Sequence, residues 1–177
     1  SRVGVGCDNI DLVAATRRGI AVCNAPDAPT VSTAEHAIAL TFAVAKQIPA
    51  LCERLKLGDR TTNYFLQNRG LELSGRIFGV VGFGRIGQRV SQLDMQVASY
   101  DSHPRDDVFR QRGVMRCRTL EELLAISDVV SLHLPLNPQT RRLFDRETLH
   151  RMKPGSLLIN TSRGELVDEA ALVEVLQ

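Results

Sequence analysis

The chain has 177 residues and a net charge of +2, and 44% of its residues are hydrophobic and 24% charged. This balance is typical of a folded globular protein and excludes a disordered chain, and the small net charge gives no reason to expect nucleic acid or a membrane as partner. The longest apolar helical stretch, residues 37–45, is far shorter than the roughly 20 residues that cross a bilayer.

Short apolar runs alternate with helical patterns along the chain. Strands are expected at 3–5, 20–23, 77–81, 96–100, 129–134 and 156–160. Between them the helix signals are clear. One helix begins at Asp11 and ends at Gly19, Thr119 and Glu122 form a capping box for another, and Asp168 begins the last. The alternation predicts an α/β fold with a parallel sheet covered by helices on both faces.

Residues 24–55 differ from the rest of the chain. Pro26 and Pro29 interrupt it, and Thr30 or Ser32 can then cap a long apolar helix over about 32–56. A proline-rich break before such a helix indicates a crossing between two domains. We therefore expect residues 1–28 to be the remnant of one domain, with its upstream part missing, and 29–177 to form a second. Residues 58–73 are expected to be a looser surface connection.

The four cysteines, Cys7, Cys23, Cys52 and Cys117, lack the close spacing of zinc sites and redox motifs. We expect them to be reduced, partly buried thiols in a cytoplasmic protein that binds no metal.

A glycine pattern follows the strand expected at 77–81. Residues 80–90 read VVGFGRIGQRV, with glycines at 82, 84 and 87 between a strand and a helix. Gly82 would make the tight turn, Gly84 would let a pyrophosphate approach the main chain, and Gly87 would let the helix pack on the strand. Arg85 adds a positive charge for the phosphates. This arrangement predicts a dinucleotide site.

Asp101 ends the next expected strand, where a carboxylate binds the ribose hydroxyls of NAD and repels the 2′-phosphate of NADP. The segment from Gly87 to Asp101 is about four residues, close to one helical turn, shorter than we expect. The cofactor is therefore expected to be NAD.

Four segments carry a resemblance to a known family: RVGVGCDNIDLVAATRRGIAVCNAP, GRIFGVVGFGRIGQRV, SDVVSLHLPLNPQTRRLF and MKPGSLLINTSRGELVDEAAL. Together they resemble the D-isomer-specific 2-hydroxyacid dehydrogenases, which interconvert D-2-hydroxy acids and 2-keto acids by hydride transfer with NAD. The resemblance implies a Rossmann-type doubly wound parallel sheet for the NAD-binding domain, with the tail of a flavodoxin-like substrate domain before it. It also implies a homodimer formed through the long helix.

The same resemblance assigns roles to individual residues. Arg163 matches the catalytic arginine that holds the substrate carboxylate and polarises its carbonyl, and the backbone of Val3, Gly4 and Val5 matches the loop that also grips that carboxylate. The implied cofactor-binding residues are Gly82, Gly84, Arg85, Ile86, Gly87, Asp101, Leu134, Pro135, Thr140, Thr161, Ser162 and Arg163. Arginine is also the side chain best suited to bidentate carboxylate binding.

The family's proton donor, a histidine oriented by a glutamate, is expected after Gln177 and so outside this chain. His36, His103, His133 and His150 all have ordinary structural explanations, with His133 expected to be a packed strand residue. Two alternatives stay open: an NAD-sensing corepressor-like binding module, and an inert gene fragment.

Overall fold

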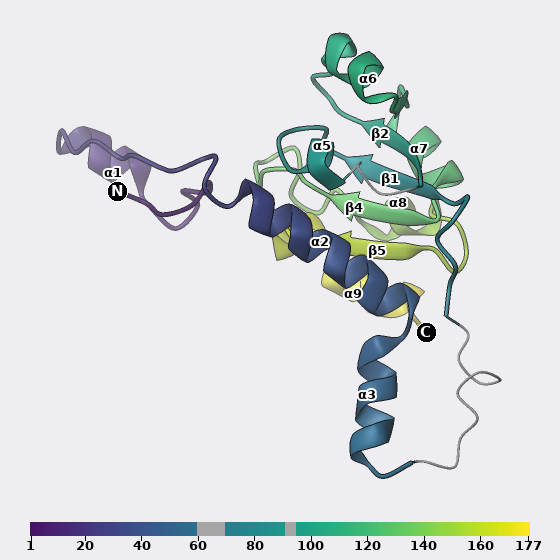
Figure 1. Ribbon diagram of the computed structural model, residues 1–177. Coiled ribbons are helices and arrows are strands. Elements are labelled where there is room, and N and C mark those ends of the chain that lie inside the picture. The colour runs from purple at the N-terminus through teal and green to yellow at the C-terminus, as the bar shows by residue number, and fades with distance from the viewer. Residues whose placement is uncertain (60–69, 91–94) are drawn as a thin grey trace.

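The computed structural model describes residues 1–59, 70–90 and 95–177. Within them, five parallel strands form one sheet in the order β3-β2-β1-β4-β5 (Figure 1). The strands are β1 (Ile77–Val81), β2 (Gln96–Tyr100), β3 (Met115–Arg116), β4 (Val129–Leu132) and β5 (Leu157–Asn160). The chain adds strands outward from β1 first in one direction and then in the other, which is the doubly wound Rossmann arrangement. The predicted fold class is confirmed.

Helices cover both faces of this sheet. Helices α2 (Thr30–Ala45) and α6 (Asp106–Arg112) contribute to the core of one face, and α5 (Gly87–Val90) packs against α2. Helices α7 (Leu120–Ile126), α8 (Arg146–His150) and α9 (Glu169–Val175) contribute to the core of the other. Because both faces are covered, consecutive strand residues are buried, and all four residues of β4 are.

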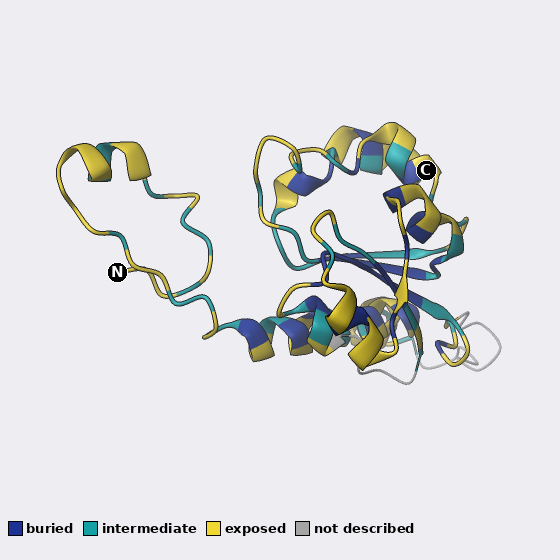
Figure 2. Cartoon of the chain, turned by 90° about the horizontal axis from the view of Figure 1, so that it is seen from above, coloured by how far each residue is buried: buried dark blue, intermediate teal, exposed yellow. Residues whose placement is uncertain are grey.

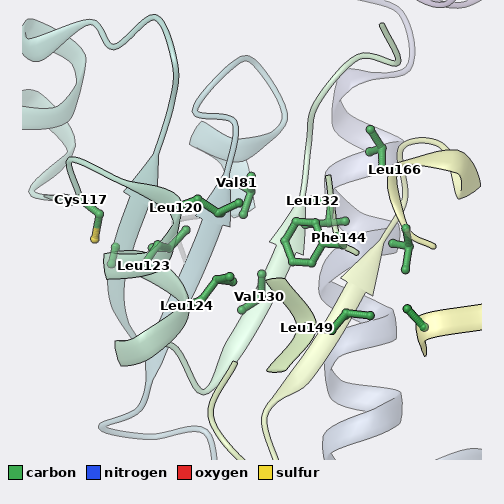
Figure 3. Packing of buried hydrophobic residues seen from close by; sticks show 13 residues of the cluster. Val81, Cys117, Leu120, Leu123, Leu124, Val130, Leu132, Phe144, Leu149 and Leu166 are labelled. Carbon is green, nitrogen blue, oxygen red and sulfur yellow. The ribbon is translucent and has the colours of Figure 1, made fainter. Parts of the chain in front are cut away.

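Successive residues of the central strands point to opposite faces of the sheet and belong to two different apolar clusters. Val80 and Val129 belong to the cluster under α2, whereas Val81 and Val130 belong to the cluster under α7 and α8. Figure 3 shows the second cluster, in which Phe144 lies among leucines from the helices and strands around it. Full burial of one such side chain stabilises the fold by about 1.5–3 kcal/mol.

The sheet matches the sequence prediction closely at its centre. The strands predicted at 77–81 and 96–100 are confirmed, whereas β4 ends at Leu132 and β5 begins at Leu157. The short edge strand β3 was missed, because two exposed residues give no hydrophobic pattern. Half of the predicted capping box is present: Thr119 accepts from the Glu122 amide at 3.2 Å. The Glu122 carboxylate accepts from the Arg118 amide at 2.7 Å, one residue before the N-cap, instead of from Thr119. Asp168 caps α9.

The N-terminal segment projects away from the sheet and carries α1 (Leu12–Arg17), with no buried residue in that helix (Figure 2). The helix is confirmed between its Asp11 cap and Gly19, which has a φ of 65°. The strands predicted at 3–5 and 20–23 are wrong. Neither run forms a strand, and the residues that flank them, Arg2 and Asn24, form one isolated parallel bridge. Two extended segments without further strands beside them do not make a stable sheet.

The single long helix predicted over about 32–56 is also wrong. The structure has α2 and then α3 (Ile48–Lys56), with Gln47 between them at a φ of 55°. Pro49 explains the break, because it has no N–H to donate to the carbonyl of Ala45. That carbonyl accepts instead from the Leu71 amide at 2.6 Å. Neither Thr30 nor Ser32 caps α2; its N-cap residue is Pro29.

Most of the connection predicted over 58–73, and part of the short segment between Gly87 and Asp101, lie outside the described residues. Among the described residues no helix is long and apolar enough to span a membrane.

Candidate functional site

The three glycines of residues 82–87 lie in three different environments. Gly82 has a φ of 91°, and a Cβ there would lie 2.8 Å from the carbonyl oxygen of His133. A Cβ on Gly87 would collide with the carbonyl oxygen of Gly82 and lie 2.8 Å from Val80 Cγ1. A Cβ on Gly84 would meet nothing within 4 Å. Gly82 and Gly87 therefore permit the fold of the loop, whereas Gly84 faces open space.

The backbone of this loop has free donors. In the part of the chain that the structure describes, the amides of Gly84, Arg85 and Ile86 donate to no protein group. Arg85 forms an ion pair with Asp27 at 2.5 Å, with both side chains mostly exposed. An exposed pair of this kind contributes little stability, so the Arg85 guanidinium can exchange this partner for a phosphate at small cost. Free amides beside a cation are suited to bind a pyrophosphate.

Asp101 follows β2 and is bonded to the glycine loop. Its Oδ2 accepts a hydrogen bond of 2.8 Å from the Phe83 amide, and its Oδ1 accepts one of 2.8 Å from the His103 amide. The Phe83 ring packs on Phe109 of α6, with 4.6 Å between ring centroids. Each carboxylate oxygen keeps further capacity to accept. The carboxylate is thus fixed beside the loop with room for two ribose hydroxyls.

A cavity of about 610 Å³ joins the glycine loop to the ends of β4 and β5. Several residues that were expected to bind substrate or cofactor line it, namely Val5, Gly84, Arg85, Ile86, Leu134, Pro135, Thr161, Ser162 and Arg163. Val3, Gly4, Asp101 and Thr140 are not among its lining residues. The Thr140 hydroxyl donates to the Pro135 carbonyl at 2.7 Å and so shapes the loop after β4.

Two buried polar atoms in the wall of this cavity have no partner among the described residues: His133 Nδ1 and Thr161 Oγ1. Leu132 pairs with Asn160 in the sheet, so His133 and Thr161 follow the last paired residues of two adjacent strands. Buried polar atoms are normally hydrogen-bonded, so these two indicate a ligand or water at that point. His133 was expected to be a packed strand residue near the cofactor; it lies just beyond β4 and lines the cavity.

His133 is neutral at physiological pH. Burial lowers its pKa from 6.5 to about 4, because the imidazolium would lose its hydration. Its Nε2 lies 2.9 Å from Ser131 Oγ. At pH 7 this imidazole is almost never in its acidic imidazolium form, so it is unsuited to act as a general acid there.

Arg163 lies beyond the carboxyl end of β5, where ligands bind in sheets of this type. The turn that carries it is fixed by Asn160, whose Nδ2 donates to the Arg163 carbonyl at 2.8 Å and whose Oδ1 accepts from the Ser162 amide at 2.9 Å. The Ser162 hydroxyl donates to the Leu132 carbonyl at 2.8 Å and joins the turn to β4. The guanidinium therefore projects from a rigid turn into the cavity.

Asp8 was not recognised from the sequence. Its Oδ2 accepts a hydrogen bond of 2.6 Å from Arg163 Nε. That bond is the main reason that the pKa of Asp8 is lowered from its usual 3.8. No local sequence signal points to this contact, because it joins two residues 155 positions apart.

The residues of the cavity fit NAD. The open face of Gly84 and the free loop amides allow close approach of a pyrophosphate, and the two unpartnered atoms offer polar partners in the cavity wall. The Asp101 carboxylate lies outside the cavity lining and is bonded to the glycine loop beside it. Among the described residues no cluster of side chains could hold a metal ion.

Comparison with known proteins agrees with this geometry. The family model described as "D-isomer specific 2-hydroxyacid dehydrogenase, NAD binding domain" matches residues 38–177. The chain is 41% identical over 180 residues to a D-3-phosphoglycerate dehydrogenase of Methanocaldococcus jannaschii, covering 99% of this chain and 34% of that protein. It is 43% identical to that of Archaeoglobus fulgidus, of which it covers 33%. It thus spans about a third of the length of these curated relatives.

Solved structures show the same relationship. The TT0316 protein from Thermus thermophilus superposes with a TM-score of 0.89 at 40% identity, over 99% of this chain and 57% of that one. D-Lactate dehydrogenase from Aquifex aeolicus, solved with NAD and lactic acid, superposes with a TM-score of 0.84 at 35% identity, over 100% of this chain and 54% of that one. The chain belongs to the D-isomer-specific 2-hydroxyacid dehydrogenase family, and it carries the NAD-binding domain of that family.

Proposed function

We propose that this chain is the cofactor-binding part of an NAD-dependent dehydrogenase that interconverts a D-2-hydroxy acid and its 2-keto acid. One observation carries the proposal: the glycine loop and the Arg163 guanidinium line the same cavity of about 610 Å³. A site that binds a nicotinamide cofactor beside an arginine with Nη donors unpartnered among the described residues suits a 2-keto acid as substrate, because such donors bind a carboxylate.

In this proposal one set of residues binds the cofactor and Arg163 binds the substrate. The amides of the glycine loop and Arg85 bind the pyrophosphate, and Asp101 binds the adenosine ribose. Thr161 and His133 line the cavity further along, and their buried unpartnered atoms Oγ1 and Nδ1 are proposed to gain partners when it is filled. Bound NADH supplies the hydride that reduces the keto carbon. Arg163 holds the substrate carboxylate and draws electron density from the adjacent carbonyl.

The organisation of the whole protein is part of this proposal. We place the boundary between a substrate domain and the NAD-binding domain near residues 28 and 29, where the projecting segment meets α2 (Figure 1). We also propose a cytoplasmic location. All four cysteines are free thiols, as in proteins of a reducing compartment.

We further propose a homodimer in which α2 and α3 of one copy face those of its partner. Large apolar side chains are exposed along these helices and just beyond them, namely Val31, Phe42, Val44, Ile48, Leu55 and Leu57. Leu57 is 81% exposed. Exposed large apolar side chains gathered on neighbouring helices favour an interface with another chain.

The test of the catalytic proposal uses the complete protein that contains this chain. NADH oxidation is followed with glyoxylate, hydroxypyruvate and pyruvate. Arg163→Lys keeps the charge but loses the planar fork, and it is expected to lower kcat/KM by about 10²-fold or more. Arg151→Lys is the matched control, because Arg151 lies on the surface and its ion pairs among the described residues are with Glu121 and Glu147. Full activity of Arg163→Lys on every substrate would contradict the proposal.

A further inference from the structure

The guanidinium of Arg163 is held from two sides. Its Nε donates to Asp8 Oδ2 at 2.6 Å, and its Nη1 donates to the carbonyl of Ser162 at 2.9 Å. The first partner comes from the projecting N-terminal segment and the second from the turn after β5. A guanidinium bonded at two of its nitrogens in this way cannot rotate about its terminal bonds without breaking one of the two bonds.

The two bonds leave the carboxylate-binding end of the guanidinium open. An arginine side chain has five N–H donors, one on Nε and two on each Nη. Asp8 uses the Nε donor and Ser162 uses one on Nη1, so one donor on Nη1 and both on Nη2 have no partner among the described residues. Parallel donors on Nη1 and Nη2 are the fork that binds a carboxylate bidentately. Asp8 is bonded at Nε, so the donors of Nη2 and one donor of Nη1 remain for a substrate carboxylate.

Gly6 provides the space for this arrangement. A Cβ at residue 6 would collide with Arg163 Nη2 and lie 2.8 Å from Asp8 Oδ2. The backbone of Gly6 is itself fixed, because its carbonyl accepts a hydrogen bond of 3.0 Å from Arg2 Nε. A side chain larger than hydrogen at this position would push the guanidinium out of its place.

Asp8 is ionised at neutral pH, since the hydrogen bond from Arg163 and the charges of Arg163 and Arg2 hold the pKa of its carboxyl below the usual value. A charge-assisted bond of this kind is short and strong, and it orients the group that donates it. Partners that orient a functional group are often as important to a site as the group itself.

We propose that Asp8 is a positioning residue that fixes the guanidinium plane of Arg163 for a substrate carboxylate, and that Gly6 is the gap in which that guanidinium lies. This inference rests on the proposed function. It adds that the substrate-binding arginine depends on the N-terminal segment, so that the carboxylate site is complete only when that segment is docked.

The experiment compares variants of the complete protein by steady-state kinetics with NADH and a 2-keto acid. Asp8→Ala is expected to raise KM for the keto acid and lower kcat, for a fall of about 10²-fold in kcat/KM, because the guanidinium loses its orientation. Asp8→Asn keeps an oxygen that can accept from Nε but loses the charge. Its kcat/KM is therefore expected to lie between that of Asp8→Ala and that of the unaltered protein. The dissociation constant of NADH, measured by fluorescence, is expected to stay unchanged in both.

Controls separate positioning from local damage. Asp11→Ala removes the α1 cap, in which Asp11 accepts from the Ala14 amide at 2.8 Å, without touching Arg163, and is expected to keep kcat/KM. Gly6→Ala is expected to behave like Asp8→Ala. Gly164→Ala, where a Cβ meets nothing within 4 Å, is expected to stay active.

Two results would overturn the inference: an Asp8→Ala variant as active as the unaltered protein, or equal losses in Asp8→Ala and Asp11→Ala. A faster Asp8→Ala variant would also overturn it, because Asp8 would then be a competitor of the substrate. Failure of the proposed function looks different, since the unaltered protein would then reduce no 2-keto acid or Arg163→Lys would stay fully active.

Discussion

Phe83 and Asp101 are joined by a hydrogen bond of 2.8 Å from the Phe83 amide to the Asp101 carboxylate. The bond ties the end of β2 to the glycine loop after β1, two strands that are neighbours in the sheet. The carboxylate that is proposed to bind the ribose is thereby fixed relative to the amides that are proposed to bind the pyrophosphate.

Removal of this carboxylate should change cofactor choice. Asp101→Ala is expected to weaken NAD binding by about 10- to 100-fold, which corresponds to the loss of hydrogen bonds to a charged group. It should also reduce the preference for NAD over NADP, because the repulsion of the 2′-phosphate is lost. Calorimetry with both cofactors measures the effect, and Asp107→Ala on the surface of α6 is the control. An unaltered protein that binds NADP at least as tightly as NAD would show that this role of Asp101 is wrong.

Two glycines of the loop should respond differently to the same change. Gly87→Ala forces a Cβ against the Gly82 carbonyl, so it is expected to lower the free energy of unfolding by about 1–3 kcal/mol. Gly84→Ala meets no atom, so its stability should be unchanged while NADH binding weakens. Thermal melts without cofactor and fluorescence titration with NADH separate the two effects. Equal melting temperatures for the two variants would contradict the environments described for these glycines.

His133 should make stability depend on pH in a defined window. Its pKa is about 4 in the folded protein and near 6.5 when unfolded, so between these values the unfolded chain binds more protons. Stability is therefore complete above about pH 6.5 and is lost as the pH falls toward 4, by up to about 3 kcal/mol. Denaturant unfolding at several pH values measures this slope. His133→Gln, which does not titrate, should flatten it, and an unchanged slope in this variant would refute the assignment.

The proposed dimer should depend on the exposed face of α2. Phe42→Asp places a charge on that face, where Phe42 is 40% exposed, and is expected to convert the complete protein from a dimer to a monomer. Val173→Asp on α9 is the matched control, because Val173 is 57% exposed on a different helix. Sedimentation at micromolar concentration reports the result. A monomeric unaltered protein would rule out this proposed dimer.

Residues 1–177 by themselves should bind NADH and show almost no turnover. The loop and Asp101 need only the fold described, whereas a general acid typically contributes about 10²–10⁴ in rate. His133 is neutral at pH 7 and so is not an effective general acid. The other histidines of the chain are His36, His103 and His150. Turnover of about 1 per second or more would point to one of these as a substitute acid. Absence of NADH binding would instead favour an inert fragment.

The centre of the sheet and the position of the glycine loop could be predicted from the sequence alone. The strand at 77–81 could be predicted because a continuous apolar run of that length is characteristic of a strand buried on both faces. The strand at 96–100 could be predicted from its apolar and aromatic residues and its place before Asp101. The glycines could be located because a tight turn and close packing exclude side chains whatever lies elsewhere in the chain. Because the glycines follow the strand at 77–81 directly, the chain must turn at that point.

The long-range contacts of these elements could be seen only in the folded chain. The sequence offered apolar runs at 3–5 and 20–23, yet they form no sheet, because strand pairing depends on neighbours that local sequence does not specify. Arg163 was identified from its segment, but its bond to Asp8 joins residues 155 positions apart and follows from where the N-terminal segment docks. The unpartnered atoms of His133 and Thr161 likewise become visible only when β4 and β5 lie side by side, since burial and hydrogen bonding are properties of the assembled chain.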